Sequence, residues 1–206
     1  MMRKIAITVV FALGAIAGAQ KRSAQLRHWL LTDNETLWIG RYSNCQYGYY
    51  SLLPAGVVAH AEHPPSPHHG FMINLPDVGV RTEVTFDNSD RFIWVNAEYN
   101  VTEESTLAGV SDYQIDLTSG RKENFKLVER RQAKLQTVPA TRFKAEYDSP
   151  KGRVIEEEIV VLRSGVVYEL GLRTLAPDYE ADRERLEQTL RGFRFTQTPA
   201  GQCWNR

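Results

Sequence analysis

Hydrophobic and polar residues alternate most regularly over residues 139–195, where the pattern predicts three strands, a helix and a short final strand. Apolar side chains occupy every second position in Pro139–Tyr147 and in Val166–Thr174, which is the period of a half-buried strand. Val154–Leu162 lies between them and is joined to the next strand by Ser164-Gly165, a pair that suits a primed hairpin turn because glycine adopts positive φ without steric cost. We therefore expect an antiparallel meander.

An amphipathic helix is predicted directly after the meander. Apolar residues recur at helical intervals from Tyr179 to Phe193, and Pro177 is placed for a first helical turn. Gly192 ends the pattern, and a short aromatic strand at 193–195 follows. Because one apolar stripe does not hold a helix together in water, packing on the sheet must supply most of its stability.

The pattern upstream is less regular but is still that of an α+β protein. Residues 47–61 read as two short strands about a turn or as one bent edge strand, and the weak apolar stripe of 103–119 predicts a first helix. Further strands are expected at 70–76, 80–86, 92–99 and 125–135. The charged run Glu129-Arg130-Arg131 in the last of these is typical of a solvated face or of an edge protected against further strand pairing.

These elements predict one α+β domain with an antiparallel sheet of about six to eight strands flanked by two helices. We place the domain at residues 45–199, after a poorly defined lead-in at 20–44, and assign 200–206 to a carboxy-terminal tail.

Residues 1–19 have the pattern of a secretory signal peptide. Arg3-Lys4 is a basic start, Ile5–Ile16 is an apolar run, and Ala17-Gly18-Ala19 is a small-x-small cleavage site. The alternative is an uncleaved amino-terminal anchor, although the run is short for a membrane span. The pattern predicts a periplasmic or secreted protein that has no membrane span after cleavage.

The charge balance favours neither of two classes of partner, nucleic acids and anionic membranes. The chain of 206 residues carries 25 basic and 25 acidic residues, and loss of Arg3 and Lys4 leaves 25 − 2 = 23 basic against 25 acidic, a net charge of −2. A balanced or slightly acidic chain indicates neither nucleic-acid binding nor attraction to an anionic membrane.

The two cysteines, Cys45 and Cys203, lie near the two ends of the expected mature chain. An even pair in an exported protein predicts a disulfide, whereas two unpaired thiols are the alternative. The bond would close a loop of about 160 residues, for which the chain-entropy model gives at most roughly 5 kcal/mol. A nucleophilic role for Cys45 beside a histidine would be lost on pairing.

Four of the five histidines gather in the proline-rich segment 60–69. His60, His63, His68 and His69 are candidate metal ligands, with Glu62 as an oxygen donor, and zinc or copper is the metal that such a set would hold. The alternative is an exposed loop whose histidines titrate near neutral pH.

Other motifs for catalysis are weaker. The sequence contains no Gly-x-Ser-x-Gly elbow, phosphate-binding glycine loop or His-Glu-x-x-His motif. Glu156-Glu157-Glu158 could supply paired carboxylates, but on a strand Glu156 and Glu158 share one face while Glu157 points away. We therefore expect this run to be a solvated edge and assign no catalytic or cofactor-binding residue.

The carboxy-terminal half resembles the PsbP-like (Mog1/PsbP) superfamily in the order of its segments: 139–143, 158–162, 165–174, the helix, and Arg191-Gly-Phe-Arg-Phe195. Gly70-Phe-Met-Ile-Asn-Leu-Pro76 is similar to the opening strand of that superfamily, so the resemblance covers about residues 70–195. It implies a central antiparallel sheet flanked by helices, and a role as an accessory or binding module for a larger complex, in several members outside the cytoplasm.

The sequence thus favours an exported, non-catalytic accessory or binding protein of the cell envelope or extracellular space, acting on a protein partner that it does not identify. A metal-binding protein or metal-dependent enzyme using the histidine segment is the alternative. A structural component of the envelope is the third possibility.

Overall fold

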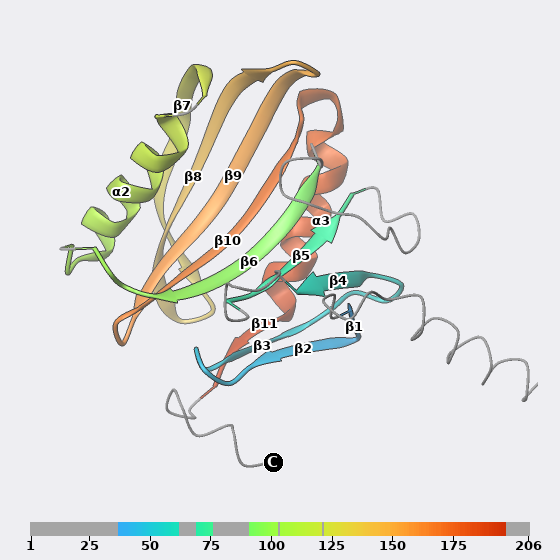
Figure 1. Ribbon diagram of the computed structural model, residues 1–206, viewed down its shortest axis with the longest axis vertical. Helices are drawn as coiled ribbons and strands as arrows, with labels where there is room; N and C mark the ends of the chain where they lie inside the picture. The colour runs from blue at the N-terminus through green and yellow to red at the C-terminus, as the bar shows by residue number, and fades with distance from the viewer. Residues whose placement is uncertain (1–36, 62–68, 76–90, 103, 121, 197–206) are drawn as a thin grey trace, which may run out of the picture. The chain divides into compact units, whose positions relative to one another are not determined.

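The computed structural model describes residues 37–61, 69–75, 91–102, 104–120 and 122–196 (Figure 1). Within these ranges the chain forms two antiparallel sheets, two α-helices and one 3-10 turn. The elements are β1 (Leu37–Ile39), β2 (Arg41–Asn44), β3 (Tyr49–Leu52), β4 (Val58–Ala61), β5 (Phe71–Asn74), β6 (Phe92–Tyr99), α2 (Leu107–Ser119), β7 (Glu123–Leu135), β8 (Val138–Ser149), β9 (Gly152–Arg163), β10 (Val166–Leu175), η1 (Ala176–Asp178), α3 (Tyr179–Gly192) and β11 (Phe193–Phe195).

The large sheet has eight strands in the order β1-β4-β5-β6-β10-β9-β8-β7, and every neighbouring pair is antiparallel. The consecutive strands β10, β9 and β8 form the predicted meander. Ser164 and Gly165 join β9 to β10 with φ of 54° and 76°, the conformation of a type I′ turn. The fold class and the meander are therefore confirmed.

The two helices lie on opposite faces of this sheet. Alternate residues of a strand point to opposite faces, and the two sets pack into different apolar clusters. Val110 and Ile115 of α2 pack with Phe143 in one cluster, while Leu186 and Leu190 of α3 belong to the larger cluster on the other face. In Figure 1, α2 lies at the left of the view beside β7 and β8, and α3 lies at the right.

The short strand β11 follows α3 and forms the edge of a second sheet, in the order β11-β3-β2. Phe193 stacks on Tyr49 with ring centroids 5.1 Å apart. Gly192 permits this turn, because a Cβ at that position would lie 2.2 Å from the carbonyl oxygen of Leu52. The predicted aromatic strand is present, and it ties the end of α3 to the amino-terminal strands.

Two sequence-based expectations are wrong within the described residues. Residues 37–44, assigned to the lead-in, form β1 and β2, so the folded region begins before Cys45. The run at 156–158 is not a sheet edge, because β9 is paired with β8 on one side and with β10 on the other. The signal peptide at 1–19, the strand at 80–86 and the tail at 200–206 lie outside the described residues.

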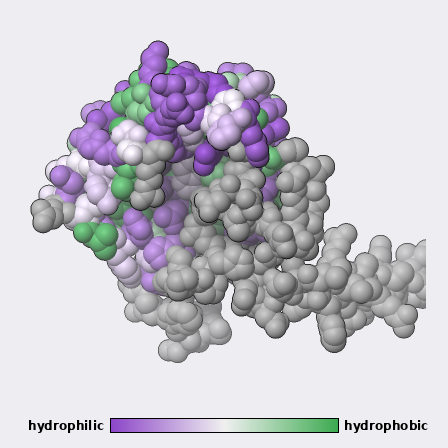
Figure 2. All heavy atoms as spheres, turned by 45° about the horizontal axis from the view of Figure 1, so that its top comes forward, coloured by the Kyte–Doolittle hydropathy of each residue, from purple (hydrophilic) through white to green (hydrophobic). Residues whose placement is uncertain are grey.

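Apolar side chains on the described surface are scattered. Ile39 and Leu52 are exposed near the small sheet, and Tyr113 and Leu117 on α2. The face shown in Figure 2 is mostly hydrophilic where it is described, with apolar residues in small separate groups. No helix in the described ranges combines the length and apolar character that a membrane crossing requires.

Candidate functional site

The histidine segment is only partly described. His60 lies in β4 and His69 just before β5, while Glu62, His63 and His68 fall outside the described residues. The Nε2 atom of His69 lies 3.4 Å from the hydroxyl of Tyr47, and the two rings are in contact. Among the residues that are described, no three His, Cys, Asp or Glu side chains gather as a metal site. The zinc or copper site stays a prediction.

The predicted disulfide is also only partly described. Cys45 lies in the turn between β2 and β3 and is exposed, while Cys203 falls outside the described residues. The pairing of Cys45 with Cys203 therefore also stays a prediction.

The most unusual chemistry lies instead in the carboxylate run of β9. Glu156, Glu157 and Glu158 are 6%, 5% and 4% exposed. The expectation of a solvated edge is wrong for a physical reason, since a strand paired on both sides has only its two faces left, and both faces are packed here. Buried carboxylates need partners, and the two faces of β9 provide them differently.

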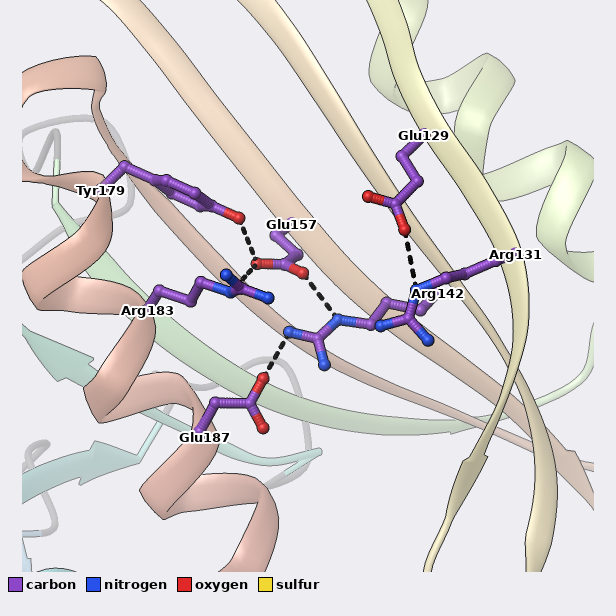
Figure 3. Close-up of polar contacts among 7 residues, drawn as sticks. All are labelled: Glu129, Arg131, Arg142, Glu157, Tyr179, Arg183 and Glu187. Carbon is purple, nitrogen blue, oxygen red and sulfur yellow. Dashed lines mark hydrogen bonds and ion pairs between the residues drawn. The ribbon is translucent and has the colours of Figure 1, made fainter.

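On the α3 face, Glu157 is held by three side chains (Figure 3). The Nε atom of Arg142 donates to Glu157 at 2.6 Å, and the hydroxyl of Tyr179 donates to its other oxygen at 2.8 Å. Arg183 adds an ion pair at 3.7 Å. Arg142 also donates through Nη2 to Glu187 of α3 at 2.6 Å, so it links β8, β9 and α3.

These contacts govern the ionisation of the network. Burial disfavours the charge of Arg142, but its hydrogen bonds to Glu157 and Glu187 outweigh that cost, and the pKa of the guanidinium is raised. Burial, together with the bond to the Glu157 carboxylate, raises the pKa of the Tyr179 hydroxyl. Arg142 is thus a cation that is held in place by Glu157 of β9 and Glu187 of α3.

On the α2 face, Glu156 and Glu158 have unequal surroundings. Glu156 accepts hydrogen bonds from the hydroxyl of Tyr147 at 2.8 Å and from Nζ of Lys122 at 2.6 Å. The Oε1 atom of Glu158 is buried and has no hydrogen-bond partner in the part of the chain that the structure describes. Burial, with the nearby charges of Glu169 and Glu156, raises the pKa of Glu158 well above its usual range. We therefore assign Glu158 as a buried carboxylic acid.

A groove of about 370 Å³ opens beside the Arg142 network, between α3 and the strands β7 and β8. Its basic side chains come from three parts of the chain and are Arg131, Lys134, Arg142, Arg191 and Arg194. Glu187 is the carboxylate among its lining residues. Apolar parts of the lining are Ala133, Leu135, Ile159 and Leu190.

The groove is positively charged even after its internal ion pairs are counted. Arg131 donates to Glu129 at 2.8 Å, and Arg142 is bonded to Glu157 and Glu187. Five basic side chains less these three carboxylates leave 5 − 3 = +2. Because the whole chain has a formal net charge of zero, this is a local concentration of charge. We refer to this site as the cationic groove.

Two of its arginines face each other across neighbouring strands. Arg131 of β7 lies directly opposite Arg142 of β8 in the sheet register. Like charges in such a pair are destabilising unless other groups compensate them. Glu157 and Glu187 compensate the buried Arg142, whereas Arg131 has Glu129 and is about half exposed.

No family model matches the sequence, and no curated protein matches it. Solved structures match it in fold. Cyanobacterial PsbP (CyanoP) from Synechocystis sp. PCC 6803 gives a TM-score of 0.51 at 13% sequence identity, covering 80% of this chain and 94% of that one. The Saccharomyces cerevisiae Ran-binding protein Mog1p gives a TM-score of 0.50 at 10% identity, covering 79% and 98%.

The chain therefore has a PsbP/Mog1-like fold, as the resemblance predicted. At these identities the likeness shows the fold alone. What the domain does has to be argued from its own residues.

Proposed function

We propose that this protein is an exported accessory protein that binds another protein through a preformed charged surface. The observation that carries the proposal is the cationic groove, whose central arginine is held by two carboxylates from different elements. The groove also concentrates positive charge on a chain whose formal net charge is zero, which favours recognition by charge complementarity.

The chemistry of the lining residues supports binding rather than catalysis. The groove is lined by Arg, Lys, Gln, Glu and apolar residues, and none of these lining residues is a Ser, Cys or His nucleophile. Arginine is also enriched in protein interfaces, because its planar guanidinium forms paired bonds with carboxylates.

The comparisons support the same role. Mog1p, which shares this fold, is described as a Ran-binding protein, so the fold serves as a protein-binding domain in at least that case. The signal-peptide pattern at residues 1–19 supports action in the cell envelope or extracellular space.

Affinity purification from the native host tests this proposal. The full-length chain, tagged at its carboxyl end, is recovered from the envelope and extracellular fractions after mild cross-linking. We expect a mature amino terminus at Gln20 and one protein recovered in stoichiometric amount. Recovery of the chain alone, or with an intact Met1 in the cytoplasm, would contradict it.

A further inference from the structure

The cationic groove has basic groups that the fold itself does not use. Lys134 and Arg191 are exposed and form no ion pair within the described ranges, and Arg131 has one carboxylate partner. Arg194 differs, because its Nη1 donates to the backbone carbonyls of Arg191 and Phe193 at the end of α3. Arg131, Lys134 and Arg191 are therefore the side chains available to an incoming anion.

These three groups are spread along a surface rather than gathered on one point. A second hollow, of about 580 Å³, lies toward α2 and shares Arg131, Ala133 and Lys134 with the cationic groove. Residues 131–134 of β7 thus border a hollow on each side, and β7 is the last strand of the large sheet. The two hollows lie on opposite faces of the sheet and meet at the β7 edge, so an extended ligand that follows this edge reaches both, whereas a single small ion does not.

The chemical groups that line the groove favour carboxylates on a peptide as the ligand. Guanidinium groups pair with carboxylates through two parallel hydrogen bonds, and Ala133, Leu135 and Leu190 offer apolar contacts between the charges. A duplex nucleic acid requires a broad basic face, which a chain of zero net charge with one local excess does not favour.

We propose that the cationic groove binds an acidic, extended segment of a partner protein, whose carboxylates pair with Arg131, Lys134 and Arg191. This inference rests on the proposed protein-binding function and names the site and the chemistry of the partner. Arg142 is already paired with Glu157 and Glu187, so it is not among the side chains that bind the carboxylates of the partner.

The test is a binding titration of the full chain with a short fluorescein-labelled peptide of alternating glutamate and serine, followed by fluorescence anisotropy. The uncharged comparison peptide has glutamine in place of glutamate. We expect the acidic peptide to bind, the glutamine peptide not to bind, and the affinity to fall as salt is added, because screening weakens exposed ion pairs.

A variant carrying Lys134→Glu and Arg191→Glu should bind the acidic peptide at least about tenfold more weakly. Lys126→Glu is the matched control, since Lys126 is exposed on the same strand and does not line the groove. Lys134→Gln with Arg191→Gln is a milder second variant, and circular dichroism shows that each variant is folded.

Four results would overturn the inference: equal binding by the groove variant and the control, equal binding of the glutamine peptide, displacement of the peptide by inorganic phosphate at equal concentration, or preferential binding of a duplex oligonucleotide. None of these results would affect the recovery of a partner from the native host. Failure of this inference is therefore distinguishable from failure of the proposed function.

Discussion

Replacing Glu158 by glutamine should change how the stability of the protein depends on pH. Glu158 is buried on β9 without a partner for Oε1 among the described residues, and its pKa is raised by burial and by Glu169 and Glu156. The folded chain therefore keeps a proton that the unfolded chain releases above its ordinary pKa of about 4.3. Glutamine has nearly the same shape and never ionises, so it removes this linkage.

The magnitude follows from the number of protons exchanged. Below the pKa of Glu158 in the unfolded chain, this carboxyl is protonated in both states, and its contribution to the free energy of unfolding is fully present. Between the unfolded and the raised folded pKa, unfolding releases one proton, and the free energy of unfolding falls by about 1.4 kcal/mol for each pH unit. The variant lacks this fall, so the difference between the two proteins grows with pH across that window and then levels off.

Urea unfolding followed by circular dichroism, from acidic to mildly alkaline pH, measures this difference. A constant offset of about 1–3 kcal/mol from the new amide group would not affect the argument, since the slope is what is compared. Glu184→Gln, the same change on an exposed position of α3, controls for the loss of one carboxylate. Parallel pH profiles for wild type and Glu158→Gln would refute the assignment of Glu158 as a buried acid.

Three further predictions concern the other parts of the molecule. Arg142→Ala should lower the free energy of unfolding by about 3–5 kcal/mol, because it leaves Glu157 buried without its closest cation. The double change Arg142→Met with Glu157→Leu should lower it far less, since no buried charge is left unpaired. Urea unfolding compares the two proteins, and a mild effect of the single change would contradict the buried ion pair. The alternative metal hypothesis predicts that calorimetry will show zinc binding to the full chain that is lost in His63→Ala, and equal titrations of the two proteins would end that hypothesis. Thiol titration of the secreted protein, denatured without reductant, should find Cys45 and Cys203 unreactive, and two reactive thiols would disprove the disulfide.

The regular strands could be predicted because their signal is local. In β8 and β10 the alternation of apolar and polar residues is set by the faces of the strand itself, and Ser164-Gly165 specifies its turn through backbone conformation. The short strands β1 and β2 were missed, because three or four residues that include Arg41 and Ser43 are too few to show a period.

The candidate site could not be predicted, because it depends on pairing between distant segments. Glu157 looks solvated in sequence, but β9 is paired on both sides, and Arg142 and Tyr179 from other elements bind the buried carboxylate. The cationic groove likewise exists only once the register of β7 and the placement of α3 bring Arg131 and Arg191 to one surface. The sequence shows only that charged residues stand next to apolar ones. This pattern does not distinguish charges that face solvent from buried charges that are paired within the fold.

Site-specific photo-crosslinking in the native host tests the central claim most directly. A photo-reactive amino acid replaces Ala133, which lines the cationic groove, and in a second protein it replaces Leu117, which is exposed on α2. We predict that position 133 crosslinks to an acidic segment of one protein, identified by mass spectrometry, and that Lys134→Glu with Arg191→Glu abolishes this product while position 117 does not form it. Equal crosslinking from both positions, or a crosslinked segment without acidic residues, would contradict the account.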